Sequence, residues 1–276
     1  MEYNIIHTII VLLSLTLVVL ILSRIILSYQ ASKSRGGSNQ GIAQTCGSRD
    51  VQEDCHAVVK TSRGTLAILA DGMGKNKCGI VSSSLAVETA LDLFERDNAF
   101  QNPNYFFQKV FRQANRRILD QLDDAYGGAS VGVALFDGKT LYYSVVGNVQ
   151  IAVFRSGNLV PITEGHTVSV LAEKKYLEGS LTRQDTIALL KERRLYNYVG
   201  RDEFVDIEVF DQPIGLRQGD TVVLMTDGVH EAIPYVKLES ILTQSGNCQD
   251  KANAAIRAVD EFLGAKDNAS ILLISV

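Results

Sequence analysis

Apolar residues in this chain of 276 residues gather in short runs that polar turns separate. Brief apolar or alternating runs are typical of strands, whereas apolar residues that recur every three to four positions are typical of amphipathic helices. Helices are predicted at residues 80–94, 105–122 and 251–263. Strands are predicted at 55–60, 64–70, 130–136, 140–146, 150–154, 159–162, 205–210, 221–225 and 269–276.

The order of these elements favours an α+β fold. Two strands come first, a pair of helices follows, and four short strands come next. The turns Asp137–Gly138 and Ser156–Gly157–Asn158 join members of this set, which predicts an antiparallel meander. A charge-rich segment from 164 to 203 has mixed helical signals and no strand. Two stacked antiparallel sheets flanked by helices fit this order best.

The most apolar stretch lies at the N-terminus. Residues 5–22 carry no charged side chain, and the stretch to residue 27 is long enough to cross a bilayer as one helix. A cleaved signal peptide or a buried helix is the alternative, but positive charges follow the apolar run instead of preceding it. We expect a single-pass membrane protein with an anchor at 1–30 that spans the membrane through 5–27. A flexible linker at 31–48 and a cytoplasmic domain at 49–276 would follow.

Composition narrows the possible functions. The formal net charge is -4 and the basic residues are scattered, so nothing indicates a nucleic-acid-binding surface. The four cysteines, at 46, 55, 78 and 248, form no CxxC pair. We interpret them as free thiols in a reducing compartment, which makes a zinc site improbable.

Acidic residues stand where apolar runs begin or end, and one fold could bring them to one end of a sheet. The motifs are Glu53-Asp54, Asp71-Gly72, Asp227-Gly228 and Asp267-Asn268. Any one of them alone is most often a solvated turn. Together they indicate a site for a hard divalent cation, because clustered carboxylates repel one another unless a cation neutralises them. A glycine after the aspartate also lets a main-chain carbonyl join the ligands. This chemistry points to hydrolysis by activated water.

The wider order of motifs closely resembles the metal-dependent protein phosphatases of type 2C (the PPM family), in their bacterial form. The resemblance covers nearly all of residues 49–276. The matching motifs are Arg49-x-x-x-Glu53-Asp54, Asp71-Gly72-Met73-Gly74, Gly127-Gly128-Ala129-Ser130, Gly147-Asn148, Gly165-His166-Thr167, Gly219-Asp220 with Thr226-Asp227-Gly228, and Asp267-Asn268-Ala269-Ser270.

This resemblance implies an α-β-β-α sandwich with a binuclear Mn²⁺ or Mg²⁺ centre that hydrolyses phosphoserine and phosphothreonine. Phosphoproteins and a cognate Ser/Thr kinase are the implied partners. The implied catalytic residues are Arg49, which would hold the phosphate, Asp71 and Asp227. The implied metal ligands are Glu53, Asp54 directly or through water, Asp71 as the bridge between the ions, the Gly72 carbonyl, Asp227 and Asp267.

Three positions depart from the family pattern. Met73 stands where many eukaryotic members have a histidine, which leaves the leaving-group acid unassigned. Asn148 replaces an aspartate and Gln150 an arginine, so we expect a third metal ion to be weak or absent. These changes keep an alternative open: a catalytically weak or inactive phosphatase-fold module that acts as a membrane-tethered binding or sensing protein.

The segment from 164 to 203 corresponds to the family's mobile flap. Its basic residues form either a solvated helix face or a surface for an acidic phosphoprotein. They are Lys174, Lys175, Lys191, Arg193 and Arg194. Three histidines near the acidic motifs, His56, His166 and His230, are interpreted as packing or supporting residues because carboxylates already suit a hard cation.

Overall fold

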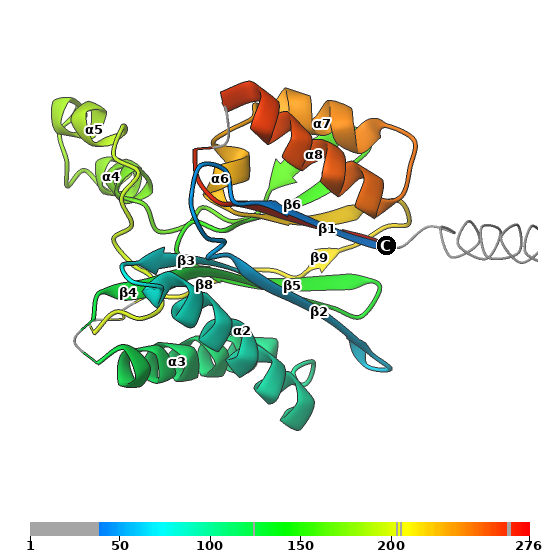
Figure 1. Cartoon of the computed structure of the whole chain (residues 1–276), viewed down its shortest axis with the longest axis horizontal. Coiled ribbons are helices and arrows are strands. Elements are labelled where there is room, and N and C mark those ends of the chain that lie inside the picture. The colour runs from blue at the N-terminus through cyan, green and yellow to red at the C-terminus, as the bar shows by residue number, and fades with distance from the viewer. Residues whose placement is uncertain (1–38, 124, 203, 205, 264–265) are drawn as a thin grey trace, which may run out of the picture. The chain divides into compact units, whose positions relative to one another are not determined.

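The structure is a computed structural model that describes residues 39–276, apart from 124, 203, 205 and 264–265. Residues 39–276 form one compact unit. Two antiparallel sheets are stacked on each other, and helices cover both outer faces (Figure 1). The predicted α+β sandwich is therefore confirmed for this unit.

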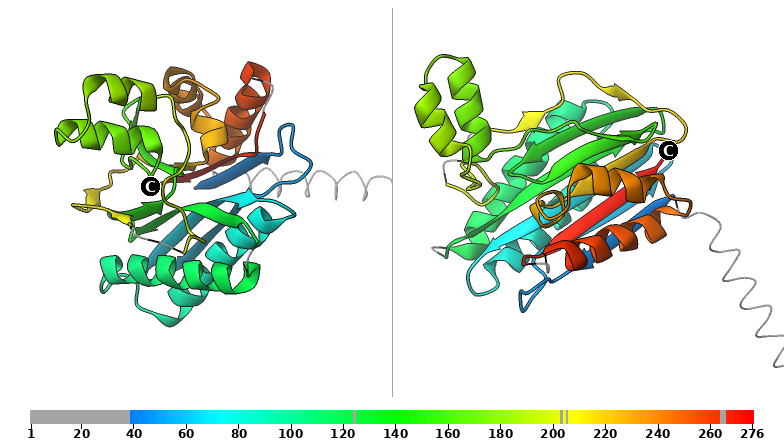
Figure 2. Two further views of the ribbon diagram at one scale, coloured as in Figure 1. Left: turned by 90° about the vertical axis from the view of Figure 1, so that its left-hand side faces the viewer. Right: turned by 90° about the horizontal axis from the view of Figure 1, so that it is seen from above.

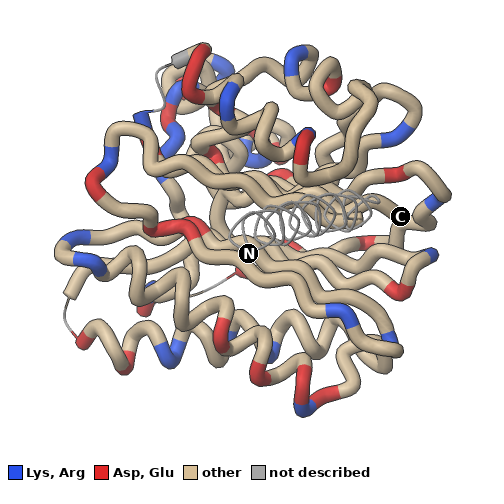
Figure 3. The backbone as a smooth tube through the Cα atoms, turned by 45° about the vertical axis from the view of Figure 1, so that its right-hand side comes forward, with Lys and Arg blue, Asp and Glu red and all other residues tan. Residues whose placement is uncertain are grey.

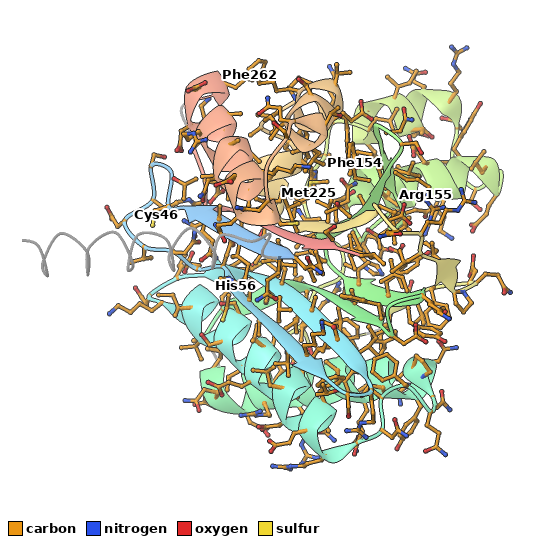
Figure 4. All side chains as sticks on the ribbon, turned by 90° about the vertical axis from the view of Figure 1, so that its right-hand side faces the viewer. Cys46, His56, Phe154, Arg155, Met225 and Phe262 are labelled. Carbon is orange, nitrogen blue, oxygen red and sulfur yellow. The ribbon has the colours of Figure 1, made fainter. Side chains whose placement is uncertain are left out.

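The first sheet has the strand order β1-β11-β10-β6-β7. Helices α7 (Tyr235–Thr243) and α8 (Cys248–Leu263) cover its outer face, and the short helix α6 (Asp227–His230) follows β10 directly. Phe154 and Met225 belong to the apolar cluster between these helices and the sheet (Figure 4). The strands are β1 (Gln40–Thr45), β11 (Ala269–Ser275), β10 (Thr221–Met225), β6 (Gln150–Arg155) and β7 (Asn158–Pro161).

The second sheet has the order β2-β3-β4-β5-β8, with β9 also paired to β5. Helices α2 (Cys78–Arg96) and α3 (Pro103–Leu122) cover its outer face, while α4 (Val168–Leu177) and α5 (Arg183–Leu189) stand apart from both helical layers (Figure 2). The strands are β2 (Cys55–Thr61), β3 (Gly64–Gly74), β4 (Gly127–Phe136), β5 (Thr140–Val146), β8 (Glu208–Val209) and β9 (Ile214–Gly215).

The central strands are buried on both faces, which explains their continuous apolar runs. Leu66 and Ile68 of β3 face helices α2 and α3. Leu69 faces the layer between the sheets, where it meets Val145 of β5 and Leu224 of β10. All five side chains are completely buried. The four cysteines are free, as predicted.

One part of the predicted linker at 31–48 is wrong. Gln40–Thr45 form β1, which pairs with β11 from Gln40 opposite Ile274 to Thr45 opposite Ala269. This strand lies at the sheet edge and its one buried residue is Gly41, so its sequence shows little of the apolar alternation that marks a strand. Residues 31–38 lie outside the described residues.

The predicted four-stranded meander is also wrong. β4 pairs with β5 in one sheet and β6 pairs with β7 in the other, so the chain changes sheets at residues 147–149. Apolar patterns locate strands but do not specify partners, and a strand buried on both faces can join either sheet. The predicted strand at 205–210 shortens to β8 at Glu208–Val209 among the residues described.

The predicted membrane localisation is contradicted. Across residues 39–276, as far as they are described, no helix is long and apolar enough to span a bilayer. The anchor predicted at 1–30, with its span at 5–27, lies outside the described residues. We therefore withdraw the assignment of a single-pass membrane protein.

Two close approaches of the backbone fix the start of α2 against β3. A Cβ atom at Gly72 would lie 2.2 Å from the Gly79 carbonyl oxygen and 2.7 Å from the Glu53 carbonyl oxygen. Both neighbours are main-chain atoms, so no side chain can rotate away to make room. Position 72 therefore requires glycine.

We expect Gly72→Ala to lower the midpoint of thermal unfolding by several degrees, because overpacking of this kind costs about 1–3 kcal/mol. Differential scanning calorimetry measures the change. Gly215→Ala is the matched control, since its Cβ would meet nothing within 4 Å. Equal midpoints for the two variants would contradict this packing.

A partly buried ion pair ties β6 to the start of β10. Arg155 Nε donates to Asp220 Oδ1 at 2.9 Å, and its Nη2 donates to Asp220 Oδ2. The Arg217 amide donates to the same carboxylate at 2.7 Å. The hydrogen bond from Arg155 lowers the pKa of Asp220 below its ordinary value. This accounts for the Gly219-Asp220 motif as a structural feature.

We expect Asp220→Asn to lower the unfolding midpoint at pH 7. A carboxyl with a lowered folded-state pKa stabilises the fold above its unfolded pKa and loses that effect as pH falls through the folded value. The difference between wild type and variant should therefore shrink below about pH 4. Thermal unfolding of wild type and variant, followed by circular dichroism at pH 7 and below about pH 4, measures this difference. Glu178→Gln, which removes an exposed pair with Lys175, is the control and should change little.

Candidate metal centre

The acidic motifs meet because antiparallel strands bring opposite chain ends to one end of the sandwich. β3 carries Asp71 near its C-terminal end, and α6 begins with Asp227 directly after β10. Glu53 lies just before β2 and Asp267 just before β11. Asp71 stays within the ladder, opposite Ser130 of β4, so its backbone position is fixed.

A cavity of about 270 Å³ opens among these residues. It contains every predicted site residue except Asp54. The predicted residues that line it are Arg49, Glu53, Asp71, Gly72, Asp227 and Asp267, and the others are Met73, Gly74, Ser130, Asn148, Arg193 and Leu195. Four carboxylates and two guanidinium groups thus line one cavity, which leaves an excess of negative charge.

The pKa of Asp71 reflects the crowding of carboxylates around the cavity. Burial raises it well above its ordinary value, and the charges of Asp227 and Asp54 raise it further. The side chain nevertheless keeps part of its surface open to the cavity. A divalent cation at this point would favour the ionised carboxylate and reverse the shift.

Asp54 lies behind the cavity. Ser270 and Thr226 donate their hydroxyl hydrogens to its Oδ2, whereas Oδ1 is buried without a hydrogen-bond partner among the described residues. Burial is the main cause that raises the pKa of Asp54 to about 6. Asp54 does not line the cavity, so its binding to an ion directly or through water stays a prediction.

Two cavity carboxylates already have partners. Arg49 Nη2 donates to Asp267 Oδ2 at 2.7 Å, and Asn148 Nδ2 donates to Asp227 Oδ2 at 2.8 Å. Within the described part of the chain, no three acidic, cysteine or histidine side chains gather closely enough to hold one ion by themselves. An ion here would therefore also use the Gly72 carbonyl and water. The residues fit such an ion, because the donors are all oxygens and carry excess negative charge.

Asn268 holds the loop that carries Arg49 and Glu53. Its Oδ1 accepts from the Glu53 amide at 2.8 Å, and its Nδ2 donates to the carbonyls of Cys46 and Val51 at 3.1 and 2.9 Å. Hydrogen bonds made by a buried side-chain amide are costly to lose. The asparagine of the Asp267-Asn268 motif therefore orients two site residues through their backbone.

Sequence reasoning missed three cavity residues. Ser130 stands in a recognised motif, but nothing in the sequence shows that it faces the cavity. Arg193 and Leu195 come from the segment between α5 and β8 and reach the cavity from outside the sandwich. Arg193 also forms an ion pair with Glu231 of α6.

The other basic side chains of this segment are mostly paired with neighbouring acids. Lys174 bonds to Glu164 at 2.8 Å and Lys175 to Glu178 at 3.0 Å. Figure 3 shows positive and negative residues interspersed along the backbone. The interpretation as a solvated helix face therefore fits these lysines better than a surface for an acidic protein.

Two of the three histidines support the fold around the site. His166 is buried, and its Nδ1 accepts from the Gly147 amide at 3.1 Å, so its proton is on Nε2. His230 Nε2 contacts the Asn148 carbonyl at 3.1 Å. His56 lies on β2, half-buried, and burial lowers its pKa (Figure 4). These positions agree with the predicted supporting roles of His166 and His230.

Sequence comparison finds bacterial phosphatases among the relatives of this chain. It is 24% identical over 216 residues to "Serine/threonine phosphatase stp" of Listeria monocytogenes, which covers 76% of this chain and 83% of the relative. It is 26% identical over 229 residues to "Protein phosphatase PhpP" of Streptococcus pneumoniae, which covers 80% of this chain and 89% of that protein.

Solved structures share the fold. The Streptococcus agalactiae serine/threonine phosphatase matches with a TM-score of 0.74 at 21% identity, over 86% of this chain and 98% of its own. The catalytic domain of the phosphatase PstP, solved in complex with two manganese ions, matches with a TM-score of 0.66 at 22% identity, over 86% and 96% of the two chains.

The family model described as protein phosphatase 2C matches residues 46–264, which is most of the chain. The matched region contains all the cavity carboxylates except Asp267, which follows it by three residues. The predicted class of enzyme, a metal-dependent protein serine/threonine phosphatase, is confirmed at the level of the family. This chain belongs to the protein phosphatase 2C family.

Proposed function

We propose that this chain removes phosphate from phosphoserine and phosphothreonine in proteins, with two Mn²⁺ or Mg²⁺ ions in the cavity described above. The observation that carries the proposal is the convergence of Glu53, Asp71, Asp227 and Asp267 from four separate segments on one cavity. Structural ion pairs do not explain this excess of carboxylates, whereas a pair of hard cations does.

The ligand roles that we propose are those that the resemblance to the family implies. Asp71 would hold both ions, with the Gly72 carbonyl as a further ligand. Asp227 and Asp267 would complete the shell of one ion and Glu53 would bind the other. Asp54 would act through a bridging water, since its carboxylate lies behind the wall.

Bound ions of this kind supply positive charge that acidifies a water molecule and neutralises phosphate oxygens. The water oxygen attacks phosphorus, the ester P–O bond breaks, and the products are the free hydroxyl side chain and inorganic phosphate. Arg49 orients the phosphate, because its half-exposed guanidinium can donate two parallel hydrogen bonds to the phosphate oxygens. Met73 has no proton to give, so the leaving oxygen takes its proton from water.

The proposed catalytic domain is residues 49–276, to which β1 adds an edge strand. Its substrates are phosphoproteins, and a cognate Ser/Thr kinase that phosphorylates the same proteins is the partner we propose. The substrate class rests on the relatives, which are protein phosphatases, and the kinase rests on the resemblance to the family alone. Two ions are proposed and not three, because Asn148 offers no charge at the cavity wall.

The alternative is a phosphatase-fold module that binds phosphoproteins or metal with little turnover. Asn148 and Gln150 are the residues that favour it. Gln150 accepts a hydrogen bond from Tyr235 of α7, so it takes a packing role where the family pattern has a charged residue.

A metal titration tests both functions. We expect the whole 276-residue chain to hydrolyse p-nitrophenyl phosphate and a phosphothreonine peptide in millimolar Mn²⁺ and to stop when EDTA is added. Asp71→Asn and Asp227→Asn should each lose about a hundredfold or more of this activity, because a neutral amide holds a cation poorly. Initial rates of phosphate release measure the loss.

Asp92→Asn, an exposed change on α2, is the control and should keep wild-type rates. Equal rates in wild type and in both site variants would remove the proposed centre. Mn²⁺ binding without turnover by the folded wild type would instead support the binding module.

A further inference from the structure

The turn at residues 147–148 carries the chain from one sheet to the other. It follows β5 and leads into β6, so it lies between the two layers at the end that contains the carboxylates. Gly147 has a φ of 100°, and a Cβ there would lie 2.2 Å from Ser130 Oγ. The turn therefore rests directly on β4. Its next residue, Asn148, lines both the metal cavity and a second cavity of about 400 Å³.

Hydrogen bonds determine which way the Asn148 amide points. Ser130 Oγ donates to Asn148 Oδ1 at 2.7 Å and accepts from the Asn148 main-chain amide at 3.2 Å. Asn148 Nδ2 donates to Asp227 Oδ2 at 2.8 Å. The reverse orientation would place the amide oxygen against a carboxylate, so this network allows one orientation only.

Neighbouring elements hold the same turn from the other side. His166 Nδ1 accepts from the Gly147 amide, and the His166 amide donates to the Gly147 carbonyl at 2.8 Å. His230 of α6 contacts the Asn148 carbonyl. The backbone of Asn148 is thus fixed by contacts from β4, from α6 and from the base of the segment 164–203. A rigid backbone makes the Nδ2 position rigid as well.

An aspartate at this position would behave differently. Its carboxylate oxygen would stand in the place of Nδ2, within hydrogen-bond distance of Asp227, where two like charges repel unless a cation lies between them. The amide instead makes a charge-assisted hydrogen bond, which is roughly twice as strong as a neutral one. Asn148 therefore gives Asp227 a fixed donor without requiring another ion.

We propose that Asn148 is a positioning residue whose amide, oriented by Ser130, takes the place of a third cation beside Asp227, so that this chain is saturated by two divalent ions. The inference rests on the proposed function for its two ions. It concerns the hydrogen bond from Asn148 to Asp227, which exists without them. The titration of this chain with Mn²⁺ should therefore show no third, weaker binding step.

Asn148→Asp is the principal test, made in the whole chain. In EDTA we expect it to unfold at a lower temperature than wild type because of repulsion from Asp227. Millimolar Mn²⁺ should recover more stability in the variant than in wild type, since a bound ion stabilises the fold according to its concentration. Isothermal titration calorimetry with Mn²⁺ should give two sites for wild type and a third, weaker site for the variant.

Ser130→Ala provides a second variant in case Asn148→Asp does not fold. It removes the donor that orients the amide but leaves Asn148 itself in place. We expect it to raise the half-saturating Mn²⁺ concentration for binding severalfold in isothermal titration calorimetry, while the stoichiometry stays at two ions. A residue with only a packing role would lower stability without changing the affinity for Mn²⁺.

Asn104→Asp, an exposed asparagine of α3 given the same change in charge, is the matched control and should keep the wild-type stoichiometry. A third Mn²⁺ site in wild type would overturn the inference. So would wild-type stability in EDTA together with wild-type stoichiometry in Asn148→Asp. These binding and unfolding measurements do not depend on turnover, so a wild type that hydrolyses nothing counts against the proposed function alone.

Discussion

Repulsion among carboxylates at one end of the sandwich is the interaction on which the arrangement of the site depends. Two carboxylates about 4 Å apart repel by roughly 4 kcal/mol at an effective dielectric constant of about 20. A whole domain is stable by only about 5–15 kcal/mol. Three of these groups have hydrogen-bond donors as neighbours: Arg49 bonds to Asp267, Asn148 to Asp227, and two hydroxyls to Asp54. Asp71 has another carboxyl, Asp227, beside it, so its charge is the one that a divalent cation would offset.

Such crowding is possible only because the backbone that carries the acids cannot relax. β3 continues its ladder with β4 beyond Asp71 as far as Gly74, so the aspartate is not on a free loop. Gly72 lets α2 begin in contact with this strand, and Asn268 fastens the loop of Glu53 to the start of β11. A site built on strand ends keeps its geometry better than one built on long loops. The same rigidity prevents the carboxylates from moving apart.

The sequence predicted best the strands that have mostly apolar residues between two turns. β5 and β10 were located with their observed bounds: β10 is buried at all five positions and β5 at four of seven. β1 was missed because an edge strand needs few apolar residues. The change of sheet at residue 147 was missed because pairing depends on contacts far along the chain. Arg193 was noticed only as a basic residue, since its place in the cavity wall follows from the path of the segment that carries it.

The buried base of the segment 164–203 limits which part of it can move. His166 is buried and joined to Gly147 by two hydrogen bonds, whereas helices α4 and α5 pack mainly against each other. The ion pairs of Lys174 with Glu164 and Arg193 with Glu231 are largely exposed, and pairs of this kind contribute about 0–1 kcal/mol. Rearrangement therefore costs least beyond the base. The carbonyls of Glu192 and Arg194 accept hydrogen bonds from the start of α4, so Arg193 is tied to the helical hairpin, while Gly147 keeps Asn148 in contact with Asp227. The cavity residues Arg193 and Asn148 therefore depend on different parts of one segment.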